Sequence, residues 1–402
     1  MTADPPNVVE EPTFSIPRPP GFWPSPLGCG AVVAALVALV CAGASLVVLV
    51  ARPGPVVTIR GIMASKQDFF NDEKVQDLLL EHHIRVEVTP RGSGEVAAEV
   101  LGQKTESYDF AFPSGQPAAD LIRKERSRRH LYNRTTYLFT SPIVLASYRE
   151  YAETLVRRGI AERHSGGPDD ALYYTLKTAE FVGLGRRGET WNDIGIKGIT
   201  NGNRVLARTP GVCRSNSGLT YLGLVAYVVN GSKPVQTVSE ADQIAKEIGP
   251  LITGTGMPES ELFSVYVTPE GKSQGPVVVV YEHQFFAYQQ EQRRNSGRVD
   301  TERVLLYPEQ EFQTDPVYIS LRRGNGDRLG QLLRTDPGLR RRMLELGFRV
   351  VEHPSDPGTK PLYGLLEDNG VPVPDERTDY TRAELPKLDL LQRLADRVDE
   401  CR

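Results

Sequence analysis

Hydrophobic and polar positions after residue 55 alternate between the two-residue period of strands and the longer period of helices. VVTIRGI (56–62), IRVEVTP (84–90) and SYDFAFPSG (107–115) predict three strands. Between them, residues 65–83 and 92–103 predict helices. The apolar face of the first helix consists of Phe69, Phe70, Val75, Leu78 and Leu79. This βαβαβ order predicts an α/β fold with a mostly parallel sheet and a ligand site beyond the carboxyl ends of its strands.

Small polar residues follow each of the three predicted strands, where a helix is expected to begin. They are Ser65 and Lys66, then Gly92, Ser93 and Gly94, and finally Ser114 and Gly115. Helix N-termini present unpaired N–H groups and a partial positive charge, which suits a polar or anionic ligand. At any one position simple helix capping is an alternative explanation. Repetition along one edge of one sheet favours a binding site.

A fourth polar helix start occurs much later, in the stretch CRSNSGLTYLGLVAYVVNG (213–231). Ser215, Asn216, Ser217 and Gly218 precede the apolar run LTYLGLVAYVV, which predicts a buried helix. The combination places hydrogen-bond donors at the tip of an apolar rod. We therefore expect these four residues to bind an oxyanion or another small polar molecule.

The N-terminal region differs in character from the rest of the chain. Residues 1–26 are rich in proline and lack apolar periodicity, which predicts a disordered tail. No charged residue occurs in residues 27–51, and this length predicts a transmembrane helix. A cleaved signal peptide is the alternative, but its apolar region is shorter and follows a basic segment. The few positive charges that flank this segment favour a cytoplasmic location for the C-terminal part. The family resemblance described below favours an extracytoplasmic location instead.

Composition and motifs narrow the function. The chain has 402 residues, 40% of them hydrophobic, with a net charge of −4 and a pI of about 6.0, which gives no indication of nucleic-acid binding. The HExxH and GxxxxGK[ST] patterns are absent, and the six histidines are adjacent or scattered without metal-ligand spacing. We therefore expect no enzyme, no metal and no cofactor. A hydrolase using Ser217 is a weaker alternative that lacks an identifiable base.

Several segments, in their order along the chain, resemble one family of binding proteins. These segments are RGIMASKQDFFNDEKVQDLLLEHHIRVEVTPRGSGEVA, SYDFAFPSGQPAADLIRKE, LFTSPIVLAS, TPGVCRSNSGLTYLGLVAY, VVVVYEHQFFAY and VLLYPEQEFQTDPVYISL, followed by LELGFR. Over residues 56–350 the chain is similar to bacterial extracellular solute-binding proteins of the type 2 periplasmic-binding-protein fold, in the branch that includes sulfate and molybdate binders. The resemblance implies two α/β lobes that close over a ligand, here in a membrane-anchored variant.

The resemblance also implies lobe boundaries and further site residues. Lobe 1 would comprise residues 55–145 and 306–350, lobe 2 residues 146–305, and residues 351–402 would be an extension with one helix. Ser65, Ser93 and Ser114 would face Ser217 and Tyr281 across the cleft. Glu282 at the mouth would suit a cation or hydroxyl-bearing ligand. An outward or arginine-paired Glu282 is the alternative, which would leave the cleft suited to an anion.

Cysteine positions bear on the compartment. Cys29 and Cys41 fall in the predicted membrane segment, which leaves Cys213 and Cys401 as the pair in the remainder. Outside the cell they would form a disulfide that attaches the C-terminal tail beside the polar residues 215–218. Two unpaired thiols are the equally open alternative.

The sequence as a whole predicts a single-pass, membrane-anchored extracytoplasmic protein that binds a small polar or anionic solute. Such a protein would deliver its ligand to the permease and ATPase subunits of an ABC-type transporter, because a single helix forms no transport path. The alternative is a ligand sensor or a protein-docking scaffold that uses the same fold outside transport.

Overall fold

The computed structural model describes residues 55–102, 107–254, 259–311, 315–353, 356–375, 381–382, 384–399 and 401. The predicted tail (1–26) and the predicted membrane helix (27–51) lie outside these residues. No helix within the described residues combines the length and apolar character needed to cross a membrane.

The first sheet has the strand order β2-β1-β3-β14-β4. Its strands are β1 (Val57–Met63), β2 (Ile84–Pro90), β3 (Phe110–Phe112), β4 (Arg134–Tyr137) and β14 (Val317–Ser320). Strand β1 pairs in parallel with β2 and with β3, as the βαβαβ pattern predicts, whereas β14 is antiparallel to both of its neighbours. Strand β14 therefore comes back to the first sheet from a distant part of the chain.

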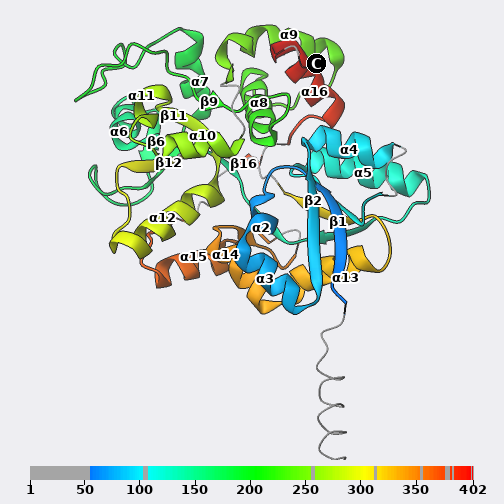
Figure 1. Ribbon diagram of the computed structural model, residues 1–402. Coiled ribbons are helices and arrows are strands. Elements are labelled where there is room, and N and C mark those ends of the chain that lie inside the picture. Colours follow the sequence, from blue (N-terminus) through cyan, green and yellow to red (C-terminus); the bar gives the residue numbers. More distant parts are fainter. Residues whose placement is uncertain are drawn as a thin grey trace, which may run out of the picture. The chain divides into compact units, whose positions relative to one another are not determined.

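Six helices accompany the first sheet and form lobe 1 with it (Figure 1). They are α2 (Asp68–Asn71), α3 (Glu73–Glu81), α4 (Ser93–Leu101), α5 (Gln116–Arg128), α13 (Asn325–Thr335) and α14 (Pro337–Glu345). Helix α3 begins where the Asp72 side chain accepts a hydrogen bond from the Val75 amide, and it buries Val75 and Leu79. The single helix predicted over residues 65–83 is thus divided at Asp72 into α2, which buries Phe69 and Phe70, and α3.

The second sheet has seven strands in the order β10-β9-β11-β6-β12-β8-β7. They are β6 (Ile143–Tyr148), β7 (Ala161–Arg163), β8 (Tyr173–Leu176), β9 (Arg208–Thr209), β10 (Thr253–Gly254), β11 (Val277–Tyr281) and β12 (Arg303–Pro308). Central strand β6 is antiparallel to β11 and β12, so this sheet is mixed. The prediction of a mostly parallel sheet is therefore wrong, because both sheets are mixed, and the part that follows the βαβαβ pattern is the pairing of β1 with β2 and β3.

The helices of lobe 2 pack on the second sheet. They are α6 (Arg149–Arg157), α7 (Thr178–Arg186), α8 (Asn216–Val229), α9 (Val238–Ile248), the 3-10 helix η2 (Gly249–Leu251), α10 (Glu259–Tyr266), α11 (Gly271–Gln274) and α12 (Glu282–Ser296). Helix α8 is buried along most of its length, as its apolar run predicts, and joins the lobe 2 core through Leu222, Leu224 and Val225. Its polar start is buried as well, since Asn216 is 6% and Ser217 is 0% exposed, and the less buried end of the helix is the C-terminal one.

The chain passes between the lobes after β4, after β12 and again after residue 350, where it leaves lobe 1 for the C-terminal extension. In the first of these connecting segments, β5 (Phe139–Thr140) pairs with β15 (Arg349–Val350), and in the second, β13 (Gln310–Glu311) pairs with β16 (Thr381–Arg382). The predicted lobe boundaries at residues 145 and 306 fall inside β6 and β12, which belong entirely to the second sheet. The predicted boundaries are thus displaced by a few residues from the connecting segments.

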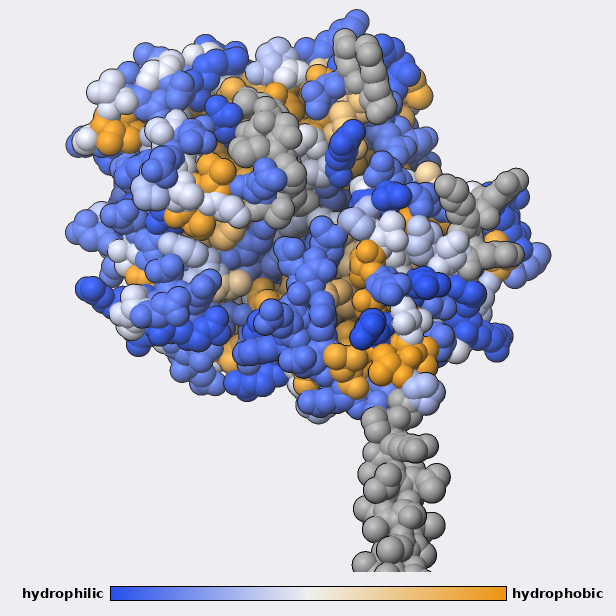
Figure 2. Space-filling model, in the orientation of Figure 1, coloured by the Kyte–Doolittle hydropathy of each residue, from blue (hydrophilic) through white to orange (hydrophobic). Residues whose placement is uncertain are grey.

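The C-terminal extension contains two helices, α15 (Thr359–Asp368) and α16 (Leu388–Asp399). Helix α15 buries Leu362 and Leu366 in the core of lobe 2. Helix α16 lies beside α9 (Figure 1) and includes three of the four leucines from which the extension helix was predicted, Leu388, Leu391 and Leu394. The face of the protein in Figure 2 is mainly hydrophilic, with smaller groups of hydrophobic residues between.

Gly61 provides a test of packing in lobe 1. A Cβ at this position would lie 2.1 Å from Phe110 Cζ, and the Phe110 ring is fully buried and stacked on Tyr318 at 4.9 Å between centroids. We expect Gly61→Ala to lower the free energy of unfolding by about 1–3 kcal/mol, measured by urea denaturation. The control is Gly364→Ala in α15, where a Cβ meets nothing within 4 Å. Equal stability of the two variants would contradict this packing.

Candidate functional site

A cavity of about 560 Å³ lies between the two lobes. Its walls come from four segments that begin helices or follow strands, and from the end of α16. The lining residues include Ser65, Lys66, Arg91, Gly92, Ser93 and Glu95 from lobe 1, and Arg214, Ser215, Asn216, Tyr281 and His283 from lobe 2. The C-terminal extension adds Asp399. The volume is within the range of about 300–1,000 Å³ that is typical of small-molecule sites.

Lys66 combines burial, strain and a charge at this cavity. It is 4% exposed, and its backbone has a φ of 78°, which is unfavourable for a residue with a side chain. Its Nζ lies 3.7 Å from the centroid of the Tyr281 ring in the other lobe. A strained backbone that holds a buried ammonium group at a cavity wall is typical of a binding site.

Asn216 connects the two lobes through its carboxamide. Its Oδ1 accepts a hydrogen bond from Ser93 Oγ at 3.3 Å, and its Nδ2 donates to the Ser114 carbonyl at 3.4 Å and to the Tyr281 hydroxyl at 3.0 Å. The Tyr281 hydroxyl is also 3.1 Å from Ser65 Oγ. Residues from three strand ends of lobe 1 thus meet α8 and β11 of lobe 2, as the sequence predicted for Ser65, Ser93, Ser114 and Tyr281.

The other serines near these residues have structural roles. Ser215 caps α8, because its Oγ accepts from the Gly218 amide at 3.2 Å, and it lies 3.0 Å from Ser217 Oγ. Ser217 is fully buried and does not line the cavity. Ser114 is also fully buried, and its Oγ donates to the Ser65 carbonyl at 2.5 Å. Ser114 and Ser217 therefore support the site without facing it, unlike the prediction.

Gly94 and Glu282 were predicted at the site and lie elsewhere. Gly94 is covered by the C-terminal extension, since a Cβ there would be 2.5 Å from Gln392 Nε2. Glu282 is 0% exposed and forms a two-point ion pair with Arg349. The alternative in which Glu282 pairs with an arginine is thus the arrangement found. The predicted carboxylate at the mouth is not supplied by this residue.

His283 is a cavity residue that the sequence prediction missed. Its Nδ1 lies 2.9 Å from Ser141 Oγ, its ring stacks on Phe348, and its Nε2 makes no hydrogen bond to any described residue. Burial, and after it the nearby charge of Lys66, lower the pKa of His283 well below its ordinary value. His283 is therefore a neutral imidazole at pH 7, which adds a polar wall without adding charge.

The cavity carries charges of both signs. Two helices of nine and fourteen residues, α4 and α8, begin at its wall, so their first-turn N–H groups and partial positive charge reinforce Lys66 and Arg214. Glu95 is occupied in capping its own helix, because its Oε2 accepts from the Gly92 amide at 2.8 Å. Over the described residues, no cluster of three or more His, Cys, Asp or Glu side chains could hold a metal ion.

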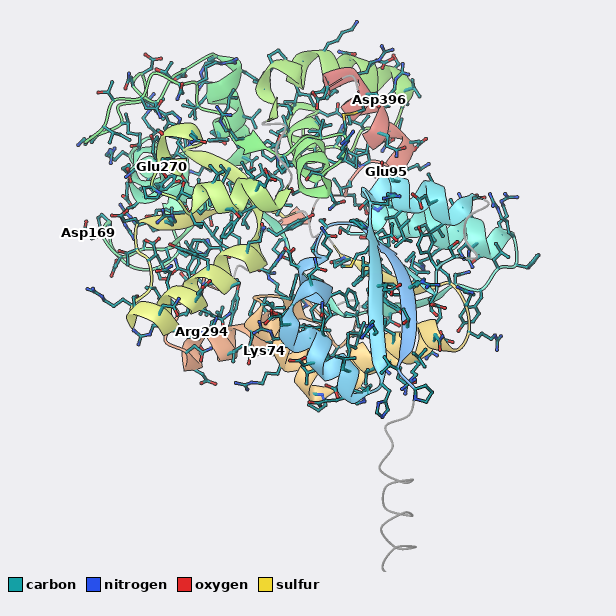
Figure 3. The ribbon with its side chains drawn as sticks, viewed as in Figure 1. Lys74, Glu95, Asp169, Glu270, Arg294 and Asp396 are labelled. Carbon is teal, nitrogen blue, oxygen red and sulfur yellow. A yellow bond between two sulfur atoms is a disulfide. The ribbon has the colours of Figure 1, made fainter. Side chains whose placement is uncertain are left out.

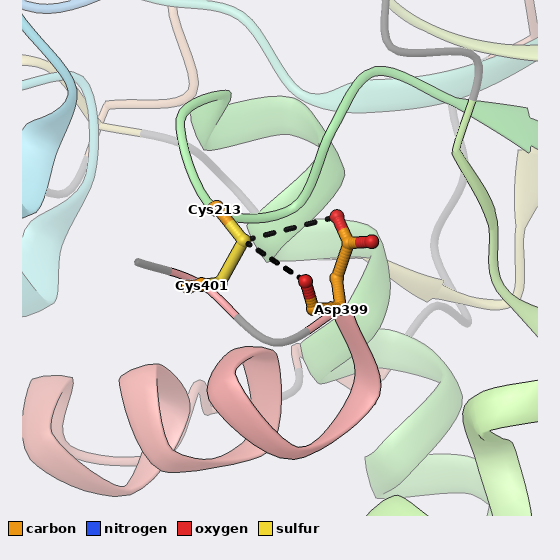
Figure 4. The surroundings of a disulfide bond; sticks show 3 residues. All are labelled: Cys213, Asp399 and Cys401. Atoms are coloured by element: carbon orange, nitrogen blue, oxygen red, sulfur yellow. Dashed lines mark hydrogen bonds between the residues drawn. A yellow bond between two sulfur atoms is a disulfide. The ribbon is translucent and has the colours of Figure 1, made fainter.

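The end of the chain is fastened beside the cavity (Figure 4). Of the two alternatives for Cys213 and Cys401, the structure contains the disulfide, with 5.3 Å between the Cα atoms. Asp399 Oδ2 lies 3.7 Å from Cys213 Sγ. A disulfide sulfur carries no hydrogen, so the two atoms are in contact but Cys213 does not donate a hydrogen bond to the carboxylate of Asp399. The bond fixes the last turn of α16 against the loop that precedes α8.

Comparison with known proteins finds similarity to solved structures but no match by family model or by sequence. No family model matches the chain, and no curated protein matches its sequence. Among solved structures, the sulfate-binding protein SubI from Mycobacterium tuberculosis is 14% identical with a TM-score of 0.43, covering 83% of this chain and 96% of that one. Iron-bound HitA from Pseudomonas aeruginosa is 12% identical with a TM-score of 0.49, covering 85% and 99%.

A third similar structure is the substrate-binding protein of the ABC transporter from Agrobacterium tumefaciens. It is 13% identical with a TM-score of 0.49, covering 88% of this chain and 96% of that one. These structure neighbours are solute-binding proteins. At such identities and TM-scores the likeness says nothing of the role or the ligand of this chain. The two-lobed architecture rests on the two sheets described above, and the ligand has to be inferred from the cavity.

Proposed function

We propose that this chain is a membrane-anchored, extracytoplasmic solute-binding protein that holds a small polar ligand between its lobes. The observation that carries the proposal is the cavity itself, because its lining comes from both lobes and from separate strand ends. Its size suits an organic molecule better than a single oxyanion. Lys66 and the N-termini of α4 and α8 would bind an anionic group on that molecule.

The proposed compartment is supported by the disulfide, since such bonds persist mainly in oxidising surroundings. The apolar segment 27–51 would then anchor the protein in the cell membrane, with the lobes outside the cytoplasm. In this arrangement the lobes would present their ligand to the permease and ATPase subunits of an ABC-type transporter. A ligand that reaches the site would replace the contacts that now join the lobes.

A protein-docking scaffold outside transport is a second candidate, and one specific observation favours it. Asn216 joins Ser93 and Ser114 of lobe 1 to Tyr281 of lobe 2 through direct hydrogen bonds. Lobes that are closed in this way could present a fixed surface to a protein partner. The two candidates differ in their response to small molecules.

Thermal denaturation of residues 54–402 with oxyanions, sugars, amino acids and polyamines tests the proposal. A ligand at a hundred times its dissociation constant adds about 2.7 kcal/mol to the free energy of unfolding, which raises Tm by several degrees. We expect Lys66→Met to abolish this rise, and Lys74→Met, on the exposed face of α3 (Figure 3), to preserve it. A chain whose Tm responds to none of these compounds would be a scaffold instead.

A further inference from the structure

The C-terminal extension forms part of the wall of the cavity. Helix α16 touches both lobes: Leu388 packs with Val96 and Ile122 in lobe 1, whereas Leu391 and Leu394 join the core of lobe 2. Arg393 and Arg397 both bind Asp242 of α9, at 2.7 Å and 2.9 Å. The helix is therefore held in one place, and its last residue, Asp399, is brought to the cavity.

Asp399 occupies an electrostatically unfavourable position for its own helix. The C-terminal end of a helix carries a partial negative charge, and an acidic side chain in the last turn adds to it. The other two carboxylates of the lining, Asp68 and Glu95, lie in the first turns of α2 and α4, where negative charge is favourable. Stabilisation of their own helices thus accounts for the positions of Asp68 and Glu95 but not for the position of Asp399.

The cavity consequently has two poles. The two poles are the charges of two lining residues: the buried ammonium group of Lys66 is the positive pole and the carboxylate of Asp399 is the negative one. The buried imidazole of His283, which is 6% exposed, adds a polar group whose Nε2 makes no hydrogen bond to any described residue. A polar side chain placed in this way at a cavity wall indicates that a ligand group completes its hydrogen bonding.

We infer that Asp399 determines specificity for a zwitterionic ligand, a small molecule with an anionic group at one end and an ammonium group at the other. This inference rests on the proposed function and deepens it. The anionic group would bind at the positive pole and the ammonium group at Asp399. The disulfide between Cys213 and Cys401 keeps the carboxylate in position, so the extension acts as a third wall that the two lobes alone would lack.

The test uses residues 54–402 and matched probes. The probes are the standard L-amino acids and 4-aminobutyrate, each compared with the carboxylate that lacks the amino group and the amine that lacks the carboxylate. We expect at least one zwitterion to raise Tm more than both of its half-molecules at equal concentration. Calorimetric titration should then show that Asp399→Asn weakens its binding by about tenfold, with binding of the carboxylate analogue preserved.

Two further variants control for structure. Asp396→Asn, one turn earlier and exposed on the same helix (Figure 3), should bind the zwitterion as the unaltered protein does, and Asp399→Glu should restore part of the lost affinity. Equal effects of Asp399→Asn and Asp396→Asn, or no zwitterion better than its halves, would overturn the inference. If a sugar or oxyanion nevertheless stabilised the protein through Lys66, the proposed function would stand alone. If no compound of any class did so, both would fall.

Discussion

Replacing Arg349 with methionine is expected to lower the free energy of unfolding by about 3–5 kcal/mol. Arg349 Nε donates to Glu282 Oε2 and its Nη2 donates to Oε1, both at 2.6 Å, and the side chains of Arg349 and Glu282 are 7% and 0% exposed. Without the guanidinium, the buried carboxylate would retain the hydroxyl of Tyr307, which donates to it at 2.7 Å. One neutral hydrogen bond does not compensate a buried charge. Urea denaturation measures the loss.

A double-mutant cycle separates the ion pair from simple loss of packing. Glu282→Leu with Arg349→Met removes both charges and should cost less than Arg349→Met alone. Arg341→Met is the surface control, because Arg341 is 69% exposed and pairs with Glu345 one turn away, an interaction worth less than about 1 kcal/mol. If Arg349→Met lowered the free energy of unfolding no more than Arg341→Met does, the importance of the ion pair would be refuted.

The position of this ion pair matters for motion of the lobes. Arg349 lies in β15, which pairs with the connecting strand β5, and the neighbouring Phe348 and Val350 belong to the core of lobe 1. Glu282 begins α12 of lobe 2. The pair therefore joins the lobes beside the connection, while Asn216 joins them at the cavity. Any separation of α8 from lobe 1 has to break the bonds of Asn216 to Ser93 and Ser114.

Local patterns were sufficient to predict the first part of lobe 1 from the sequence. The three predicted strands correspond to β1, β2 and β3, the helix predicted over 65–83 corresponds to α2 and α3, and the helix predicted over 92–103 corresponds to α4. These elements bury one face each, so their apolar period is visible without any tertiary information. The mixed sheet of lobe 2 was less visible, since the antiparallel pairing of β6 with β11 and β12 joins segments that are far apart in the chain.

The errors at the site have physical explanations. Tyr281 and His283 line the cavity, whereas Glu282, the first residue of α12, points to Arg349. Strand β11 ends at Tyr281, so the direction of the next two side chains depends on how the helix begins and was not visible in the sequence. Ser217 is turned away from the cavity because successive residues of a helix point in different directions.

The contributions of the C-terminal extension could not be predicted in this way. Gln392 lies over Gly94, and Asp399 contacts Cys213 across 186 residues of sequence, so both residues of α16 meet distant parts of the chain. No periodic pattern encodes such a contact, because it depends on how α15 and α16 return across both lobes. The only sequence signal was the pair of cysteines, which connected the end of the chain to the loop before α8.

Reduction of the Cys213–Cys401 disulfide is expected to lower the free energy of unfolding by about 2–5 kcal/mol. The bond closes a loop across a sequence separation of 188 residues, and long loops lose the most conformational entropy in the unfolded chain when they are closed. The measurement is urea denaturation of residues 54–402 with and without dithiothreitol. The Cys213→Ser/Cys401→Ser variant should match the reduced protein and be insensitive to dithiothreitol.

Because the bond also holds the end of α16, reduction should make the chain after Leu394 more susceptible to proteolysis than α9, on which the helix packs. An unchanged denaturation midpoint in dithiothreitol, with the thiols shown to be free, would refute this role of the disulfide.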